Sequence, residues 1–212
     1  MHLDHRVNEN KNSAASDRRK RSVNALENWF CASAPWRYIT RKQVLPWLLH
    51  GVELGEHVLE VGAGPGAATA ELRKRAARVT SLEYDHKFAA RLASQNHSGN
   101  GAVLRGDAAT LPFPDRTFSA CIAVLMFHHL RSAELQDRSF QEIFRVLRPG
   151  GAFLAVEIAD SWFNRVMHIK STFVPLTPAT VSSRLASAGF SKVVLNRQGS
   201  SFRIIAVRPH QS

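Results

Sequence analysis

The chain has 212 residues, 44% of them hydrophobic and 21% charged, which is typical of a soluble globular protein with one domain and some extension. No stretch approaches the roughly 18–20 apolar residues of a membrane-spanning helix, and the N-terminal residues lack the apolar core of a secretory signal. The net charge of +11 is unusual and leaves nucleic acid, an anionic membrane surface and an acidic substrate open as partners.

The two cysteines indicate neither a disulfide framework nor a metal centre. Cys121 lies in the apolar run ACIAVLMF, so we expect a buried, reduced thiol and a reducing, cytoplasmic location. Neither cysteine has a partner at metal-binding spacing, and the ten histidines are scattered. The sequence therefore predicts no metal site.

Three regions follow one another along the chain. Residues 1–22 are polar and basic and are predicted to form a flexible leader. Residues 23–50 are rich in aromatic side chains and are predicted to form a helical lid, in which Thr40 caps a helix that Pro46 kinks or displaces. Residues 51–212 are predicted to form one α/β domain.

Strand and helix patterns alternate through this last region. Strand patterns occupy residues 57–61, 78–84, 102–106, 118–127 and 152–158, and helix patterns follow the first glycines and occupy 86–94, 139–147 and 177–190. This alternation predicts a Rossmann-like, doubly wound and mostly parallel sheet of seven strands, with helices on both faces. The last two strand patterns are separated by only a few residues around QGSS, which predicts a hairpin and an antiparallel C-terminal strand.

The first predicted strand runs into a glycine-rich loop, LEVGAGPG, at residues 59–66. Gly62, Gly64 and Gly66 allow the backbone to turn sharply and to approach a ligand closely. Their G-x-G-x-G spacing differs from the G-x-G-x-x-G of dinucleotide-binding loops. Glu60 adds a carboxylate that would repel a pyrophosphate and attract an ammonium group. The loop therefore favours a ligand with an ammonium group over a nicotinamide dinucleotide.

Acidic residues stand at the ends of the next two predicted strands. Glu83 follows the glycines by about 20 residues, where a carboxylate can accept hydrogen bonds from both hydroxyls of a ribose. Asp107 follows the third strand and can accept from an exocyclic amine such as that of adenine. Because the carboxyl ends of parallel strands meet at one edge of a sheet, Glu60, Glu83 and Asp107 are expected to surround one ligand.

Five stretches in order resemble the class I S-adenosylmethionine-dependent methyltransferases, specifically the small type 11 methyltransferase domain. They are VLEVGAGPGAAT, VTSLEYD, GDAATLPFPDRTFS, VLMFHHL and EIFRVLRPGG. The resemblance implies that S-adenosyl-L-methionine is the cofactor and that residues 51–212 are the methyltransferase domain. The cofactor-binding residues that it implies are Glu60, Gly62, Ala63, Gly64 and Gly66 toward the methionyl end, Glu83 at the ribose and Tyr84 beside it, and Asp107 and Ala108 at the adenine.

The fourth predicted strand ends in MFHHL, where the active site of this family opens. His128 and His129 are the side chains there that can take a proton from a methyl acceptor, and His128 is the preferred catalytic candidate. The alternative is that one of these histidines only packs against or caps the following segment.

The tryptophans fall in the two segments that cover the acceptor pocket in the resembling family. They are Trp29, Trp36, Trp47 and Trp162. Their clustering suggests an aromatic lid over the pocket. The sequence therefore predicts methyl transfer, by in-line displacement, to a small, apolar or aromatic acceptor.

Three alternatives remain open at this point. The basic leader and the net charge are compatible with a methyltransferase that acts on phospholipid headgroups at a membrane surface, or on RNA. The stretch MFHH replaces the N/D-P-P-Y/F loop of many base-amine methyltransferases, which counts against such amine targets. A non-enzymatic protein that only binds the cofactor is the third alternative.

Overall fold

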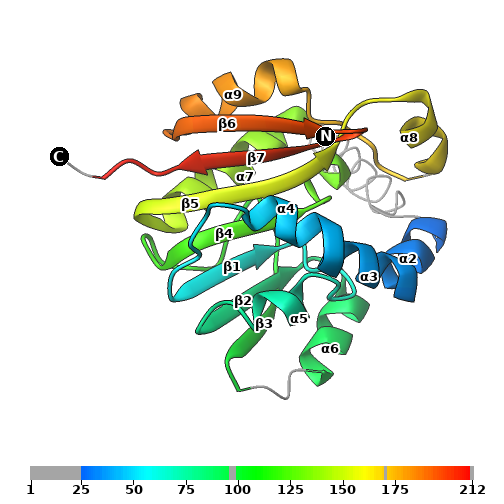
Figure 1. The fold of residues 1–212 in the computed structure, drawn as a ribbon, viewed down its shortest axis with the longest axis horizontal. Helices are drawn as coiled ribbons and strands as arrows, with labels where there is room; N and C mark the ends of the chain where they lie inside the picture. Colours follow the sequence, from blue (N-terminus) through cyan, green and yellow to red (C-terminus); the bar gives the residue numbers. More distant parts are fainter. Residues whose placement is uncertain (1–24, 96–98, 170, 211–212) are drawn as a thin grey trace, which may run out of the picture.

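A computed structural model of the chain describes residues 25–95, 99–169 and 171–210, so the predicted leader at residues 1–22 lies outside the described residues. The described part is built around one seven-stranded sheet with the strand order β3-β2-β1-β4-β5-β7-β6 (Figure 1). The strands are β1 (His57–Val61), β2 (Arg78–Glu83), β3 (Gly101–Arg105), β4 (Phe118–Val124), β5 (Leu147–Ile158), β6 (Ser191–Gln198) and β7 (Ser201–Val207).

The sheet confirms the predicted topology. Strands β3, β2, β1, β4 and β5 pair in parallel, and β7 pairs antiparallel with both β5 and β6. Strands β6 and β7 form the predicted hairpin, with Gly199 in the left-handed region at its turn. The carboxyl ends of β1, β2, β3 and β4 therefore lie along one edge of the sheet, where ligands bind in folds of this class.

Helical segments cover both faces of the sheet. They are α2 (Ala25–Ala32), α3 (Ala34–Ile39), the π-helical η1 (Thr40–Val44), α4 (Leu45–Leu49), α5 (Thr69–Leu72), α6 (His86–Ser94), the 3-10 turn η2 (Phe127–His129), α7 (Ala133–Val146), α8 (Trp162–Met167) and α9 (Pro178–Ser187). Among the described residues, no helix is long and apolar enough to cross a bilayer.

Alternate residues of each central strand pack into two separate hydrophobic clusters. On one face, Leu59 and Phe153 pack with apolar residues of α7 and α9. On the other face, Val58 and Leu154 pack with the buried leucines of α4 and with α5. This two-residue period is what a sheet covered on both faces requires.

The helical segment before β1 differs from the prediction. Thr40 is not an N-cap, because the chain is already helical from Ala34, where the side chain of Ser33 caps the helix by accepting from Trp36 N. Thr40 instead lies buried inside the π-helical turn, and its carbonyl accepts from Leu45 N. A widened turn of this kind relieves the clash that the ring of Pro46 would cause with a carbonyl one turn earlier.

Candidate active site

The glycine-rich loop follows β1 and is hydrogen-bonded to β2, because Gly62 N and Ala63 N both donate to Leu82 O. Gly62, Gly64 and Gly66 all have positive φ, at 73°, 54° and 86°, where glycine is strongly favoured. A Cβ on Gly62 would lie 2.2 Å from Met126 Cγ, whereas one on Gly64 would meet nothing within 4 Å. Gly62 is thus required by packing, while the loop is open to a ligand at Gly64.

Glu60 lies within β1, directly before this loop, and is buried. Its Oε2 accepts hydrogen bonds from the hydroxyls of Thr69 and Ser81, each at 2.7 Å. Burial raises the pKa of this carboxyl to about 7, and the two hydroxyl donors offset only part of that shift. The site therefore holds a carboxyl that titrates near neutral pH, directly below the loop.

Glu83 is the last residue of β2, and its side chain is hydrogen-bonded to the glycine-rich loop. Its Oε2 accepts from Gly64 N at 2.7 Å, and its Oε1 accepts from Asp85 N at 2.7 Å. Burial raises the pKa of the carboxyl, and these two backbone donors act in the opposite direction. A carboxylate has about four acceptor positions, so capacity remains for the two hydroxyls of a ribose. The neighbouring Tyr84 is exposed.

Asp107 and Ala108 follow β3 at the same edge. Asp107 is exposed, and its Oδ1 accepts from Ala109 N at 2.9 Å, which fixes the turn. Ala108 is buried in the core cluster below it. The structure therefore brings together the residues predicted for the cofactor. The open space at Gly64 and the acceptor positions on Glu83 and Asp107 fit an adenosyl ligand.

The end of β4 holds a buried pair of ionisable side chains. His128 is 2% exposed, and its Nδ1 lies 2.6 Å from Oε2 of Glu157, which is completely buried. The other oxygen of Glu157 accepts from Met126 N and Phe127 N at 2.9 and 2.8 Å. Because a carboxylate is only an acceptor, it places the proton of His128 on Nδ1 and the lone pair on Nε2.

Glu157, the hydrogen-bond partner of His128, is not among the residues predicted from the sequence. It stands near the end of β5, in the stretch AFLAVEI, and β5 pairs in parallel with β4. An acid at the carboxyl end of a buried strand was the available signal. That signal points to Glu157 only when β5 is known to pair with β4, the strand that precedes His128.

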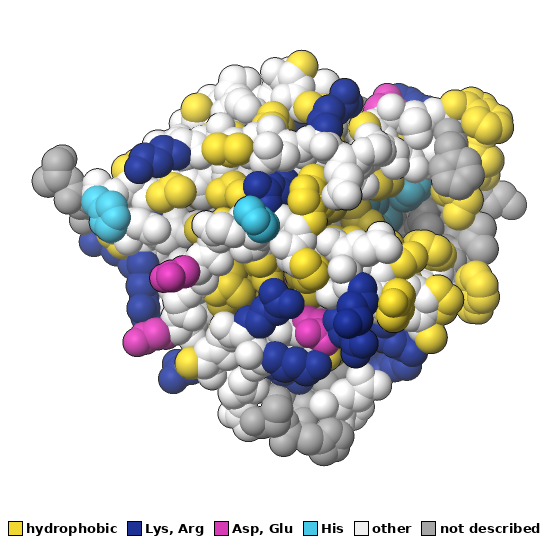
Figure 2. All heavy atoms as spheres, in the orientation of Figure 1, with side chains coloured by type: hydrophobic (Ala, Val, Ile, Leu, Met, Phe, Trp, Pro, Cys, Tyr) yellow, Lys and Arg dark blue, Asp and Glu magenta, His cyan; other side chains and the backbone are white. Residues whose placement is uncertain are grey.

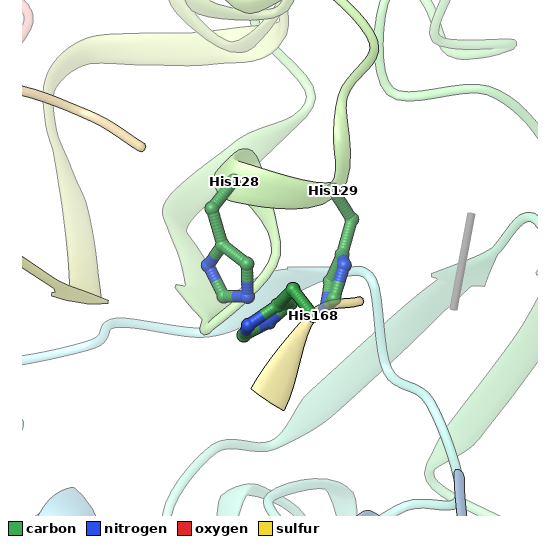
Figure 3. A group of neighbouring side chains, drawn as sticks. All are labelled: His128, His129 and His168. Atoms are coloured by element: carbon green, nitrogen blue, oxygen red, sulfur yellow. The ribbon is translucent and has the colours of Figure 1, made fainter. Parts of the chain in front are cut away.

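A third histidine reaches the same place from α8. The ring of His168 lies 5.2 Å from that of His128 and 5.6 Å from that of His129 (Figure 3). The sequence predicts His128 and His129 as neighbours, but nothing in the spacing indicates His168, because the fold brings α8 back over η2. The three histidines that are brought together here lie up to 40 positions apart in the sequence, from which no metal site is predicted.

Aromatic side chains surround the carboxyl edge of the sheet. Segments α2–α3 and α8 both lie at this edge (Figure 1), and hydrophobic side chains gather over both (Figure 2). Trp29 is 70% exposed and Trp162 is 78% exposed, and Tyr38 is also exposed. Trp36 and Trp47 are half-buried, and Trp47 packs against the α4 side of the core.

A shallow basic groove lies between α3–η1 and α5. Its lining includes Arg37, Arg41 and Lys74, and it extends to Gly66 and Ala67 of the glycine-rich loop. Basic side chains are clustered over this part of the surface (Figure 2). The groove places positive charge beside the loop.

Comparisons with known proteins show which proteins the chain is similar to in sequence. Residues 59–155 match the family model of a methyltransferase domain. The chain is 34% identical over 124 residues to a demethylmenaquinone methyltransferase of Corynebacterium kroppenstedtii, an alignment that covers 58% of this chain and 48% of the relative. It is 31% identical over 144 residues to a probable S-adenosylmethionine-dependent methyltransferase of Mycolicibacterium smegmatis, covering 64% of this chain and 52% of the relative.

The fold is also found in a solved structure. N-methyltransferase NodS from Bradyrhizobium japonicum, in complex with S-adenosyl-L-homocysteine, superposes with a TM-score of 0.69 over 94% of this chain and 100% of that chain, at 17% identity. The chain spans about half the length of the curated relatives that it matches. Residues 59–155 therefore form a methyltransferase domain, similar to the corresponding part of S-adenosylmethionine-dependent methyltransferases.

Proposed function

We propose that the chain transfers a methyl group from S-adenosylmethionine to a small, apolar acceptor that carries an aromatic or quinone ring. The observation that carries the proposal is the hydrogen bond from Gly64 N to Glu83, which joins the glycine-rich loop to an acid at the ligand-binding edge. Loop and acid together form a preorganised place for the ribose and the methionyl group.

The chain's own residues account for each part of the cofactor. When bound, S-adenosylmethionine supplies a methyl group on a positively charged sulfur. Glu83 would accept hydrogen bonds from the ribose hydroxyls, and Asp107 would accept one from the adenine amine. Glu60, once ionised, places a negative charge below the loop and favours the ammonium group. Gly64 leaves the space into which the cofactor fits.

We assign His128 as the base that takes the proton of the methyl acceptor. Because Glu157 keeps the proton of this ring on Nδ1, Nε2 is the atom that takes a proton from an acceptor hydroxyl, and the carboxylate stabilises the resulting imidazolium. His128 is almost completely buried, so the acceptor reaches it only when the segment with His168 and Phe173 moves aside. The proposal thus assigns α8 the role of a moving cover.

The acceptor class rests on the aromatic edge and on the relatives. The exposed rings of Trp29, Tyr38 and Trp162 would give an apolar, planar molecule a surface to stack on. The relative in Corynebacterium kroppenstedtii is a demethylmenaquinone methyltransferase, and the name of that protein supports a quinone ring here.

The test is transfer of a labelled methyl group by the purified full chain. The acceptors are a demethylated naphthoquinol, bulk RNA and anionic phospholipid vesicles, each with labelled S-adenosylmethionine. We expect label in the quinol, loss of transfer in Glu83→Ala, and wild-type transfer in Glu134→Gln, which changes an exposed acid of α7. Cofactor binding without transfer to any acceptor would contradict the proposal and favour a binding protein without activity.

The basic groove supports a second candidate, an acceptor that carries a phosphate. Arg37 and Arg41 line this groove beside the loop and would attract a phospholipid headgroup or an RNA backbone, whereas Lys74 is paired with Glu71 of the same groove at 2.9 Å. For this candidate, label would enter lipid or RNA, transfer would fall steeply with added salt, and Arg41→Glu would reduce it. Salt-insensitive transfer to the quinol would exclude it.

A further inference from the structure

Three imidazole rings from two segments meet beyond the end of β4. His128 and His129 lie in η2, and His168 follows α8 (Figure 3). One nitrogen from each ring takes part in a group whose members all lie within 4.8 Å of one another. Histidine is the side chain that most often ligates transition metals in proteins, so the group has the composition of a cation site.

Hydrogen bonds fix the orientation of two of these rings. Nδ1 of His128 lies 2.6 Å from the carboxylate of Glu157, and Nδ1 of His168 lies 2.6 Å from the carbonyl oxygen of Asn164. Both partners are acceptors only, so each ring carries its hydrogen on Nδ1 and its lone pair on Nε2. Metal-ligating histidines are held in this way, by a carboxylate or a backbone carbonyl on the other ring nitrogen.

The surroundings keep the group in place and partly dry. Phe173 stacks on the ring of His168 at 4.4 Å and lies 5.7 Å from the ring of His128. Val174 N donates to the carbonyl of His128 at 2.8 Å, which ties the chain after α8 to η2. Asn164 is buried, and its side chain donates to Ala159 O. The backbone around the three rings is therefore well anchored.

We propose that His128, His129 and His168 bind one divalent cation of the zinc class, with the fourth position open to water or to a ligand oxygen. Metal–nitrogen bonds of about 2.0–2.1 Å in a tetrahedral site put the nitrogens about 3.3 Å apart. The observed spread of up to 4.8 Å closes to that value when each ring shifts by less than about 1 Å, with the Nδ1 hydrogen bonds of His128 and His168 retained.

The donor set selects the cation. Three imidazole nitrogens suit Zn²⁺, Co²⁺, Ni²⁺ and Cu²⁺, whereas Mg²⁺ and Ca²⁺ require oxygen ligands. Glu157 is not among the three ligands, but its buried negative charge adjoins His128 and offsets part of the charge of the cation.

Cation and proton compete for the same atom. Nε2 of His128 is the atom that accepts the acceptor's proton in the proposed methyl transfer, and a metal bound there would block that role. Cation binding itself needs neither cofactor nor acceptor. The site is therefore tested on the protein alone, apart from the question of activity.

The test is titration of the tag-free full chain, freed of metal with a chelator, with ZnCl₂ by calorimetry and with CoCl₂ by visible absorption. We expect one equivalent of Zn²⁺, the intense absorption of tetrahedral cobalt, and no binding of Mg²⁺. His168→Ala should weaken Zn²⁺ binding by more than about 100-fold, and Glu157→Gln should weaken it by about 10–100-fold, the range seen when an outer hydrogen-bond partner of a ligand is lost.

Two control variants test for Zn²⁺ binding at histidines outside the group. His86→Ala removes an exposed histidine at the start of α6, and a variant with both His2 and His5 changed to Ala removes those near the N-terminus. Both should bind one equivalent as the wild type does, and circular dichroism should show all variants folded. Absence of Zn²⁺ binding, or wild-type binding by folded His168→Ala, would overturn the inference. That result would not contradict the proposed methyl transfer, which is measured in the presence of chelator.

Discussion

At the scale of single residues, the glycines of the loop separate packing from ligand binding. Gly62→Ala combines a positive φ with a 2.2 Å approach to Met126, so we expect a loss of about 2–4 kcal/mol in the free energy of unfolding. Gly64→Ala has the same backbone penalty, about 1 kcal/mol, but no steric contact within the chain.

The new methyl group of Gly64→Ala would instead occupy the space assigned to the cofactor, so binding of S-adenosylmethionine should weaken by at least about tenfold, about 1.4 kcal/mol. Urea unfolding and calorimetric titration of both variants measure the two effects. Equal stabilities, or undisturbed cofactor binding by Gly64→Ala, would contradict the assignment.

The pair of His128 and Glu157 gives a second prediction at this scale. His128→Gln removes the proposed proton acceptor, so kcat should fall by about 10²–10⁴-fold while the Kd for S-adenosylmethionine stays within about twofold of the wild-type value. Glu157→Gln leaves one of three buried donors without its acceptor, which should cost about 1–3 kcal/mol of stability and lower kcat as well.

Both variants are compared in steady-state assays with chelator present, so that no cation occupies the histidines. If folded His128→Gln has the wild-type kcat, His128 does not accept the proton and only packs in the core. The split between kcat and cofactor Kd distinguishes a role in chemistry from a general weakening of the fold.

At the scale of elements, the segment before β1 consists of two parts with different roles. No residue of α3 is buried, whereas Leu45, Leu48 and Leu49 of α4 are part of the core. The guanidinium of Arg203 in β7 also donates to Trp47 O. The predicted lid at residues 23–50 therefore contains, at its C-terminal end, a helix that the sheet needs.

Two truncations test this division. A chain that begins at Thr40 should fold and bind S-adenosylmethionine, because no residue of α3 is buried. It should lose transfer to an apolar acceptor, because the exposed rings of Trp29 and Tyr38 are removed. A chain that begins at Gly51 loses three core leucines, worth on the order of 5 kcal/mol, and should not fold stably. Thermal melts and cofactor titrations measure both. Full transfer by the shorter deletion would contradict the lid.

At the scale of the whole molecule, what the sequence predicts and what it misses have different physical origins. The alternation of strands and helices, the C-terminal hairpin and the residues at the carboxyl edge follow from local patterns such as VLEVGAGPG, because period and glycine spacing act within a few residues. The contacts of His128 with Glu157 and His168 depend on which strands become neighbours and on how α8 returns. These contacts join residues that are far apart in the sequence, so no local pattern predicts them.

The last prediction concerns the stability of the whole chain as a function of pH. The pKa of Glu60 is raised to about 7, while an unfolded chain has the ordinary value of 4.5. Below that ordinary value both states hold the proton, and between the two values only the folded state holds it. The free energy of unfolding therefore falls as pH rises through this window, by about 3 kcal/mol from this residue alone. Glu83, whose pKa is also raised, acts in the same direction.

Cofactor binding should reverse this trend. The ammonium group of S-adenosylmethionine favours the ionised carboxylate of Glu60, so its affinity should increase as pH rises through about 7, with release of a proton. Urea unfolding at several pH values, with and without cofactor, measures both effects. Glu60→Gln carries no titratable proton and should make both profiles less steep, leaving in the stability profile the contribution of Glu83. A wild-type stability that rises through neutral pH would show that burial does not control this carboxyl.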